Sequence, residues 1–157
     1  DLFTYSFPCT DISNAGVQKG LEEGSGTRSS LLWECEKTIE VKRPKYLLME
    51  NVKALVSQKF LPFYKKWEQW LAEMGYDNHC MVMNAKDYGV PQNRERIFIV
   101  SILGDQSFKF PKPFPLEKRL KDVLEDKVAE KYYLSDQAVE GFLKHNENHE
   151  KKGTGFI

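Results

Sequence analysis

Cysteine, net charge and long apolar runs are all scarce in this sequence of 157 residues, and each shortage excludes a class of protein. Three cysteines without a Cys-x-x-Cys pair argue against a disulfide scaffold or a zinc ribbon and favour a reducing compartment. No apolar run approaches the roughly 18 residues that a membrane-spanning helix needs. Because 23 basic residues balance 23 acidic ones, bulk charge does not indicate nucleic-acid binding, and the case for it depends on a local site.

What is present suffices for a packed domain, since 41% of the residues are hydrophobic and 29% are charged. Strand-like and helix-like segments alternate as far as residue 103. The apolar runs typical of strands lie at 2–7, 46–49, 80–83 and 97–102, and helical spacing of apolar residues occurs before Pro44 and over 63–74. This alternation predicts an α/β fold with a largely parallel sheet.

The composition of the sequence changes after Gly104. Residues 108–115 contain three prolines and predict an extended linker, whereas 116–124 and 135–143 predict short amphipathic helices before a polar tail. We therefore divide the chain into one part over 1–104 and a second over 105–157.

Reactive side chains flank three of the predicted strands. Cys9 follows the first strand, Glu50 follows the second, and Arg94 and Arg96 lead into the last. Because ligands bind outside the carboxyl ends of the strands in open α/β sheets, we expect these groups to converge at one rim, with Glu50 paired to Arg94. Residues 11–28 contain four glycines and predict a mobile loop that closes over a substrate.

Each of these residues also has a structural interpretation. Cys9 could belong to the core, and Glu50 could cap the helix that follows it. Arg94 and Arg96 could form surface ion pairs.

The remaining thiols and two of the histidines give weaker indications of a functional site. Cys35 and Cys80 fall within apolar patterns, so we predict that both lie in the core. His145 and His149 have the spacing of a helical metal pair, but without further ligands a solvated tail is the better interpretation.

The combination of motifs is far more specific than any one of them. Residues 7–9 (Phe-Pro-Cys), 49–52 (Met-Glu-Asn-Val) and 84–96 (Asn-Ala-Lys-Asp-Tyr-Gly-Val-Pro-Gln-Asn-Arg-Glu-Arg) occur in this order. Together they resemble the cytosine carbon-5 DNA methyltransferases of bacteria and phages. The resemblance implies an incomplete Rossmann-like S-adenosylmethionine-dependent methyltransferase domain over 1–104, with a mostly parallel sheet and an antiparallel last strand. It makes 105–157 the linker and the start of the target-recognition region.

The resemblance implies catalytic roles for Cys9, Glu50, Arg94 and Arg96. The Cys9 thiolate adds to carbon 6 of cytosine, which makes carbon 5 a nucleophile toward the methyl group of S-adenosylmethionine. Glu50 binds the ring nitrogen and the exocyclic amine, and the two arginines hold this carboxylate and the carbonyl of the base. The cytosine must leave the base stack to reach such a site.

The resemblance also implies binding residues and partners. Pro8 and Leu31 match residues that border the methionine end of the cofactor. Double-stranded DNA is the expected partner, a companion restriction endonuclease is left open as a second one, and no membrane or metal is expected. The expected location is the bacterial cytoplasm, at the nucleoid. The residues expected to contact the substrate or DNA are Thr10, Ser13, Asn51, Val52 and Gln92.

The chain departs from the family pattern in two places. Tyr5-Ser6 stands where Gly-Gly is common, and Thr10 stands where Gln is common. The family's glycine-rich cofactor turn would precede Asp1 and most of its recognition domain would follow Ile157, so we expect an isolated middle segment to be inactive. Other hypotheses are a non-catalytic nucleic-acid-binding fragment, a tRNA cytosine methyltransferase, and a thiol hydrolase, which would need a base histidine.

Overall fold

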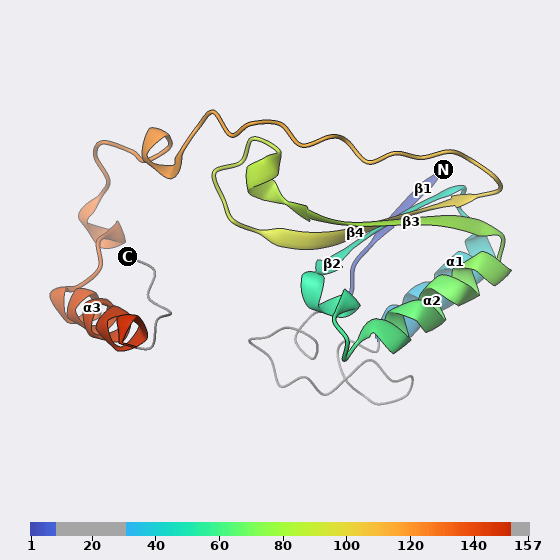
Figure 1. Ribbon diagram of the computed structural model, residues 1–157, viewed down its shortest axis with the longest axis horizontal. Coiled ribbons are helices and arrows are strands. Elements are labelled where there is room, and N and C mark those ends of the chain that lie inside the picture. The colour runs from blue at the N-terminus through green and yellow to red at the C-terminus, as the bar shows by residue number, and fades with distance from the viewer. Residues whose placement is uncertain (9–30, 152–157) are drawn as a thin grey trace. The chain divides into compact units, whose positions relative to one another are not determined.

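The computed structural model describes residues 1–8 and 31–151, and the fold is that of these residues (Figure 1). The chain divides into two compact units, residues 1–120 and 121–157. The first unit combines a four-stranded sheet with helices. Its elements are β1 (Leu2–Tyr5), α1 (Leu32–Lys42), β2 (Tyr46–Val52), the 3-10 turn η2 (Lys53–Val56), α2 (Leu61–Glu73), β3 (Tyr76–Asn84), the 3-10 turn η3 (Ala85–Asp87) and β4 (Glu95–Leu103).

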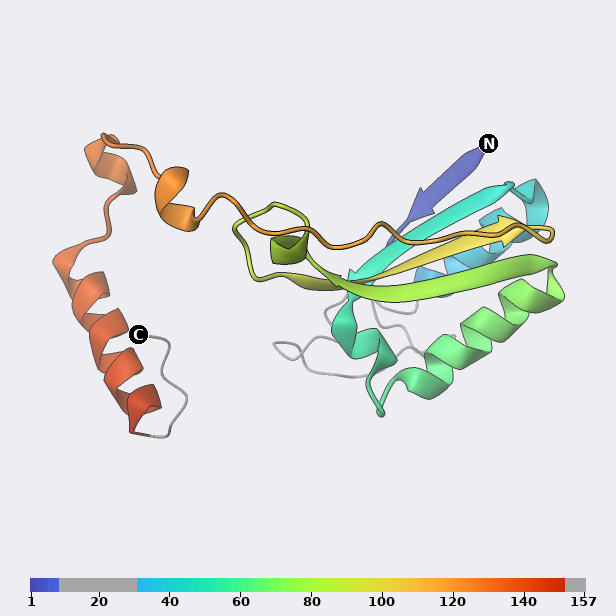
Figure 2. The same cartoon turned by 45° about the horizontal axis from the view of Figure 1, so that its top comes forward.

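The strands are arranged in the order β1-β2-β4-β3. β1 pairs with β2 in parallel, whereas β4 is antiparallel to both of its neighbours, β2 and β3. Strands β1, β2 and β3 therefore point one way, and the last strand of the chain runs between two of them in the opposite direction (Figure 2). This arrangement confirms the predicted α/β fold with a mostly parallel sheet and an antiparallel last strand.

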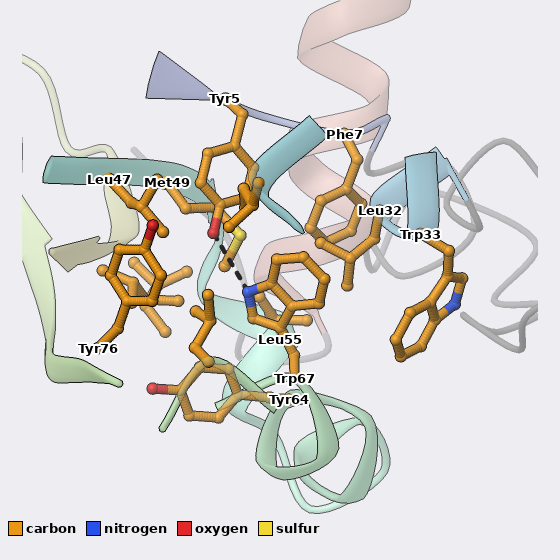
Figure 3. Close-up of a cluster of buried hydrophobic side chains, with 14 of the residues drawn as sticks. Tyr5, Phe7, Leu32, Trp33, Leu47, Met49, Leu55, Tyr64, Trp67 and Tyr76 are labelled. Atoms are coloured by element: carbon orange, nitrogen blue, oxygen red, sulfur yellow. Dashed lines mark hydrogen bonds between the residues drawn. The ribbon is translucent and has the colours of Figure 1, made fainter. Parts of the chain in front are cut away.

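Helices α1 and α2 cover one face of the sheet and enclose the core (Figure 1). Met49 of β2 and Ile99 of β4 point into it, and Trp67 of α2 lies at its centre, with 1% of its surface exposed. The indole Nε1 of Trp67 donates a hydrogen bond of 3.2 Å to the Tyr5 hydroxyl (Figure 3). Burial raises the pKa of Tyr5 above its usual range, so this hydroxyl stays neutral and serves as the acceptor for the buried indole.

Both helices end where the sequence predicts. Arg43 ends α1 with a left-handed φ of 42°, and Pro44 follows. Gly75 follows α2 with a φ of 87°, which is the conformation that favours glycine after a helix. The guanidinium of Arg43 also donates to the carbonyl of Met74 at 2.6 Å, so the two helix ends are tied together.

The second strand is longer than the sequence predicts. We expect Glu50 and Asn51 to end it, but β2 continues through both to Val52. Glu50 lies opposite Phe98 in the ladder with β4 and points to the half-buried face. Asn51 points into the core, where its side chain has hydrogen-bond partners. These polar residues do not break the strand, because the Glu50 side chain reaches solvent and the buried Asn51 side chain is hydrogen-bonded.

The prediction of a buried Cys80 is wrong. Cys80 lies on β3, which is the outer strand of the sheet, and it is exposed. An outer strand has a neighbouring strand on one side only, so its side chains can reach solvent past the free edge. Cys35 of α1 is half-buried and packs against the core, in line with the prediction.

The segment that follows β4 is extended, as its prolines predict, and it packs against the β3 side of the first unit. The ring of Phe108 lies 5.4 Å from that of His79 on β3. The Phe114 ring packs edge-on against Tyr88, and the Tyr88 hydroxyl donates to the Pro111 carbonyl. These contacts explain why the first compact unit extends to residue 120, past the sequence-based division at 104.

The second unit contains one long helix. Its elements are η4 (Leu120–Asp122, across the boundary), η5 (Glu130–Tyr132) and α3 (Asp136–Glu150). The helix predicted over 116–124 is wrong, because only one 3-10 turn forms there. α3 begins after Ser135, whose hydroxyl accepts from the backbone N–H of Ala138, and it runs past the predicted end at 143. His145 and His149 therefore lie on a helix, with ring centroids 4.4 Å apart.

Replacing Tyr5 with Phe should lower the free energy of unfolding by about 1–3 kcal/mol, because the buried indole N–H of Trp67 loses its acceptor. Urea denaturation followed by tryptophan fluorescence measures this change. Tyr46→Phe is the matched control: Tyr46 is 38% exposed, so its effect should stay within about 0.5 kcal/mol. A Tyr5→Phe protein as stable as the wild type would contradict the importance of this bond.

Candidate active site

An ion pair joins β2 and β4 on the half-buried face of the sheet. Nε of Arg96 lies 3.2 Å from Oε1 of Glu50. The ladder places Arg96 opposite Val52, two residues from Glu50, so the two charged side chains meet diagonally across the strands. The partner of Glu50 is thus Arg96 and not the predicted Arg94, because Arg94 precedes the strand and lies outside the ladder.

This pair is accessible to solvent. The Glu50 side chain is 37% exposed and the Arg96 side chain 25%. Solvent screens a pair this accessible, so it contributes little to folding. Glu50 also lies within a strand and does not cap the helix that follows, which removes the structural interpretation of this residue.

The ion pair lines a pocket of about 110 Å³. Side chains from the ends of β1, β2 and the start of β4 surround it, which is the rim where the sequence predicts a site. The pocket brings together three of the four predicted catalytic residues, while Cys9 lies outside the described residues. Its lining residues are Ser6, Phe7, Glu50, Asn51, Val52, Arg94 and Arg96.

Asn51 is the buried polar residue of this site, with 2% of its surface exposed. Its Nδ2 donates to the carbonyl of Phe7 at 3.0 Å, and its Oδ1 accepts from the backbone N–H of Val52 at 2.8 Å. The side chain therefore connects the end of β2 to the segment that leads toward Cys9. Its predicted contact with DNA stays a prediction.

Asn84 organises the connection that carries Arg94. Its Oδ1 accepts from the backbone N–H groups of Arg94 at 3.1 Å and Lys86 at 3.3 Å, and its Nδ2 donates to Asn93 Oδ1 at 2.7 Å. One side chain thus holds both ends of the connection between β3 and β4. Sequence reasoning missed this role, although an asparagine at the end of a strand and the start of a turn is a recognised signal for it.

Gly89 lies in the same connection, at a position where the backbone favours glycine. Its φ is 80°, and a Cβ at this position would lie 2.9 Å from the ring of Phe114. The glycine lets the proline-rich segment pack against Tyr88, and this contact supports the connection from its outer side.

Comparison with known proteins identifies the family. All 157 residues match the family model described as C-5 cytosine-specific DNA methylase. This chain belongs to that family. It is 53% identical over 140 residues to the type II methyltransferase M2.ScrFI of Lactococcus lactis subsp. cremoris, and 44% identical over 156 residues to the orphan methyltransferase M.SssI of Spiroplasma monobiae. These matches cover 88% and 97% of this chain but 39% of each relative, so the chain spans about two-fifths of their length.

A solved structure shows the same fold at lower sequence identity. The methyltransferase EhMeth of Entamoeba histolytica superposes with a TM-score of 0.66 at 22% identity, over 88% of this chain and 43% of that one. The likeness confirms that this chain has the predicted Rossmann-like methyltransferase fold.

The two residues that are predicted to border the cofactor lie on either side of residues 9–30. Pro8 follows β1 and is exposed, and Leu31 precedes α1 with 48% of its surface exposed. Thr10 and Ser13 lie outside the described residues. Val52 is half-buried in the pocket, and Gln92 is exposed in the connection before β4.

The two cysteines among the described residues, Cys35 and Cys80, lie away from this site. Cys35 and Cys80 do not line the pocket. Burial raises the pKa of the Cys35 thiol. Although Cys80 is exposed as a residue, its sulfur lies beside Tyr64, and partial desolvation there raises the pKa of this thiol too, so both are poorer nucleophiles at neutral pH. Within residues 1–8 and 31–151, no three His, Cys, Asp or Glu residues are grouped as a metal site would need. None of the helices described is long and apolar enough to cross a membrane.

Replacing Asn84 with Ala should lower the free energy of unfolding by about 1–2 kcal/mol, because two backbone N–H groups lose their acceptor. Chemical denaturation measures this loss of unfolding free energy. Asn93→Ala is the control, since it removes only the exposed side-chain bond to Asn84 and should cost less than about 0.5 kcal/mol. If both variants lose the same stability, Asn84 does not organise the connection.

Proposed function

We propose that the protein containing this chain is a DNA (cytosine-5-)-methyltransferase, which transfers a methyl group from S-adenosylmethionine to carbon 5 of cytosine through a covalent adduct with Cys9. The observation that carries this proposal is the pocket in which Glu50 and Arg96 are paired beside Arg94. Family membership supports the same reaction.

The pocket offers the groups that a cytosine ring requires. The Glu50 side chain accepts from the exocyclic amine and shares a proton with the ring nitrogen, and Arg96 orients it. Arg94 lines the same pocket and has a guanidinium to donate to the carbonyl of the base. The small volume suits a single ring, so the base would enter it only after leaving the base stack.

Cys9 supplies the nucleophile in this proposal. Its thiolate forms a bond to carbon 6 of the ring, and a proton that Glu50 delivers to the ring nitrogen neutralises the electron pair displaced there. Carbon 5 then becomes nucleophilic, and after it is methylated, loss of its proton and release of the Cys9 sulfur restore the aromatic ring. A free thiol has a pKa of about 8.5, so the reaction requires conditions that favour the thiolate.

The chain offers two apolar residues to the cofactor. Pro8 and Leu31 are both exposed and begin and end the segment that carries Cys9, so their surfaces suit the methionine part of S-adenosylmethionine. When bound, S-adenosylmethionine supplies the methyl group.

Double-stranded DNA is the proposed partner, and the bacterial cytoplasm is the proposed location. Thr10, Ser13, Asn51, Val52 and Gln92 are the proposed contacts to the flipped nucleotide and its neighbours. The first part of the chain is the proposed catalytic region, and the second is the proposed start of target recognition.

In the full-length protein, Cys9→Ser should lower methyl transfer by roughly a thousandfold or more, because a hydroxyl is a far weaker nucleophile at neutral pH. DNA binding should survive, since phosphate and base contacts belong largely to other residues. Tritiated methyl incorporation and a gel-shift assay measure the two effects. Cys80→Ser, an exposed thiol away from the pocket, should retain full activity; robust methylation by Cys9→Ser would overturn the mechanism.

Glu50→Gln should lower the methylation rate by roughly a hundredfold to ten-thousandfold, because the amide keeps the shape but cannot deliver a proton to the ring nitrogen or form an ion pair with Arg96. Single-turnover kinetics at saturating DNA measures the loss. Glu95→Gln is the matched control, since this neighbouring carboxylate pairs with Lys53. Equal rates for the two variants would show that Glu50 does not act on the base.

A further inference from the structure

The proline-rich segment after β4 runs back along the sheet and meets the connection between β3 and β4 at Phe114 (Figure 2). The backbone N–H of Phe114 donates to the carbonyl of Asp87 at 3.0 Å. Its ring packs edge-on against that of Tyr88, with the centroids 6.1 Å apart, and it also covers Gly89, where a Cβ would lie 2.9 Å from the ring. Phe114 therefore contacts three successive residues of the connection.

Phe114 is fixed by its own neighbours and is not part of the core. Pro113 has a fixed φ, and Pro115 restricts the backbone of the residue before it, which is Phe114. The Tyr88 hydroxyl donates to the carbonyl of Pro111 at 3.2 Å, so a further bond joins the same two segments. Because Phe114 is 54% exposed, its contacts serve the connection and not the packing of the sheet.

Hydrogen bonds through Ala85 lead from the residues beneath Phe114 to the backbone of Arg94. The carbonyl of Ala85 accepts from the backbone N–H groups of Tyr88 at 3.0 Å and Val90 at 3.2 Å. The N–H of Ala85 donates to the carbonyl of Arg94 at 3.0 Å. One residue therefore joins the part of the connection that Phe114 contacts to the part that carries the guanidinium.

The connection has few other contacts that would hold it. Residues 85–95 contribute no side chain to the core cluster of the described residues. Segments with few buried apolar contacts open locally at a low cost in free energy. Among the residues that the structure describes, no hydrogen bond or ion pair holds the Arg94 guanidinium, whereas Glu50 holds that of Arg96. The place of the Arg94 side chain in the pocket therefore depends on its backbone.

We propose that Phe114 is a positioning residue, which holds the connection between β3 and β4 so that the Arg94 guanidinium stays in the pocket. The inference rests on the proposed function, because it assigns the purpose of this contact to the binding of a base beside Arg94. Phe114 contributes by reducing the conformations of the connection that must be excluded before Arg94 can bind the carbonyl of the base.

Phe114→Ala in the full-length protein tests this role, because an exposed ring can be removed without opening the core. We expect the single-turnover rate at saturating DNA and cofactor to fall roughly tenfold, with KM for DNA and the thermal midpoint unchanged. Phe114→Tyr keeps the ring and should restore the rate to within about twofold. Phe110→Ala is the matched control: this ring packs against Phe108 in the same segment, so its loss should change the rate by less than about twofold.

A double-mutant cycle tests whether Phe114 acts through Arg94. In an Arg94→Ala background, replacing Phe114 with Ala should lower the rate by less than about twofold, because the side chain to be positioned is already absent. Hydrogen exchange gives a readout that does not depend on methylation. Exchange of a peptide over residues 84–94 should be faster in Phe114→Ala than in the wild type, and unchanged in Phe114→Tyr and Phe110→Ala.

The positioning role is overturned if Phe114→Ala has the wild-type rate or the wild-type exchange. It is also overturned by a loss of rate that Phe114→Tyr does not restore, or that is just as large in the Arg94→Ala background, since a general structural defect would produce either. A wild-type protein that methylates no cytosine-containing duplex would overturn the proposed function instead. The exchange rates alone would then decide whether Phe114 holds the connection.

Discussion

The insertion of β4 between β2 and β3 is the constraint on which the site depends. Pairing with β2 sets Arg96 opposite Val52, and pairing with β3 sets Glu95 opposite Asn84. A shift of either register by one residue would turn each side chain of β4 to the other face of the sheet. Ile97 would then leave the core and Arg96 would enter it. Burial of the isoleucines on one face therefore keeps the guanidinium directed toward Glu50 on the other.

The two polar side chains buried beneath the sheet, Asn51 and Ser101, are tolerated because both have hydrogen-bond partners. The Ser101 hydroxyl is fully buried and donates to Asn78 Oδ1 at 2.6 Å, and Asn78 in turn donates to the carbonyl of Glu68 on α2. Asn51 follows the same rule near the pocket. Apolar residues at these positions would also pack, but apolar contacts do not depend on direction and would not fix the relative position of the elements. Hydrogen-bonded ones hold strands and helix at one relative position, which is what a site assembled from strand ends requires.

Local sequence signals account for most of the elements and fail where the outcome depends on neighbouring strands. Pro44 and Gly75 end their helices through backbone conformation alone, so both ends can be predicted. The continuation of β2 through Glu50 and Asn51 could not be predicted, because polar residues in a strand are stable only if β4 and Phe7 supply partners. The exposure of Cys80 could not be predicted either, since an apolar pattern does not reveal which strand is outermost.

The sequence by itself determined the residue types of the site, their order along the chain and the family to which they belong. It placed a carboxylate after one predicted strand and two guanidinium groups before the last one, and the resemblance implies an antiparallel last strand, whose start lies at the rim where the parallel strands end. Only the tertiary structure decided that Glu50 pairs with Arg96, because the partner follows from the register of an antiparallel ladder. The same holds for Asn51 and Asn84, whose partners are brought to them by packing. Hydrogen bonds reach about 3 Å, so contacts between residues far apart in sequence appear only once the chain is folded.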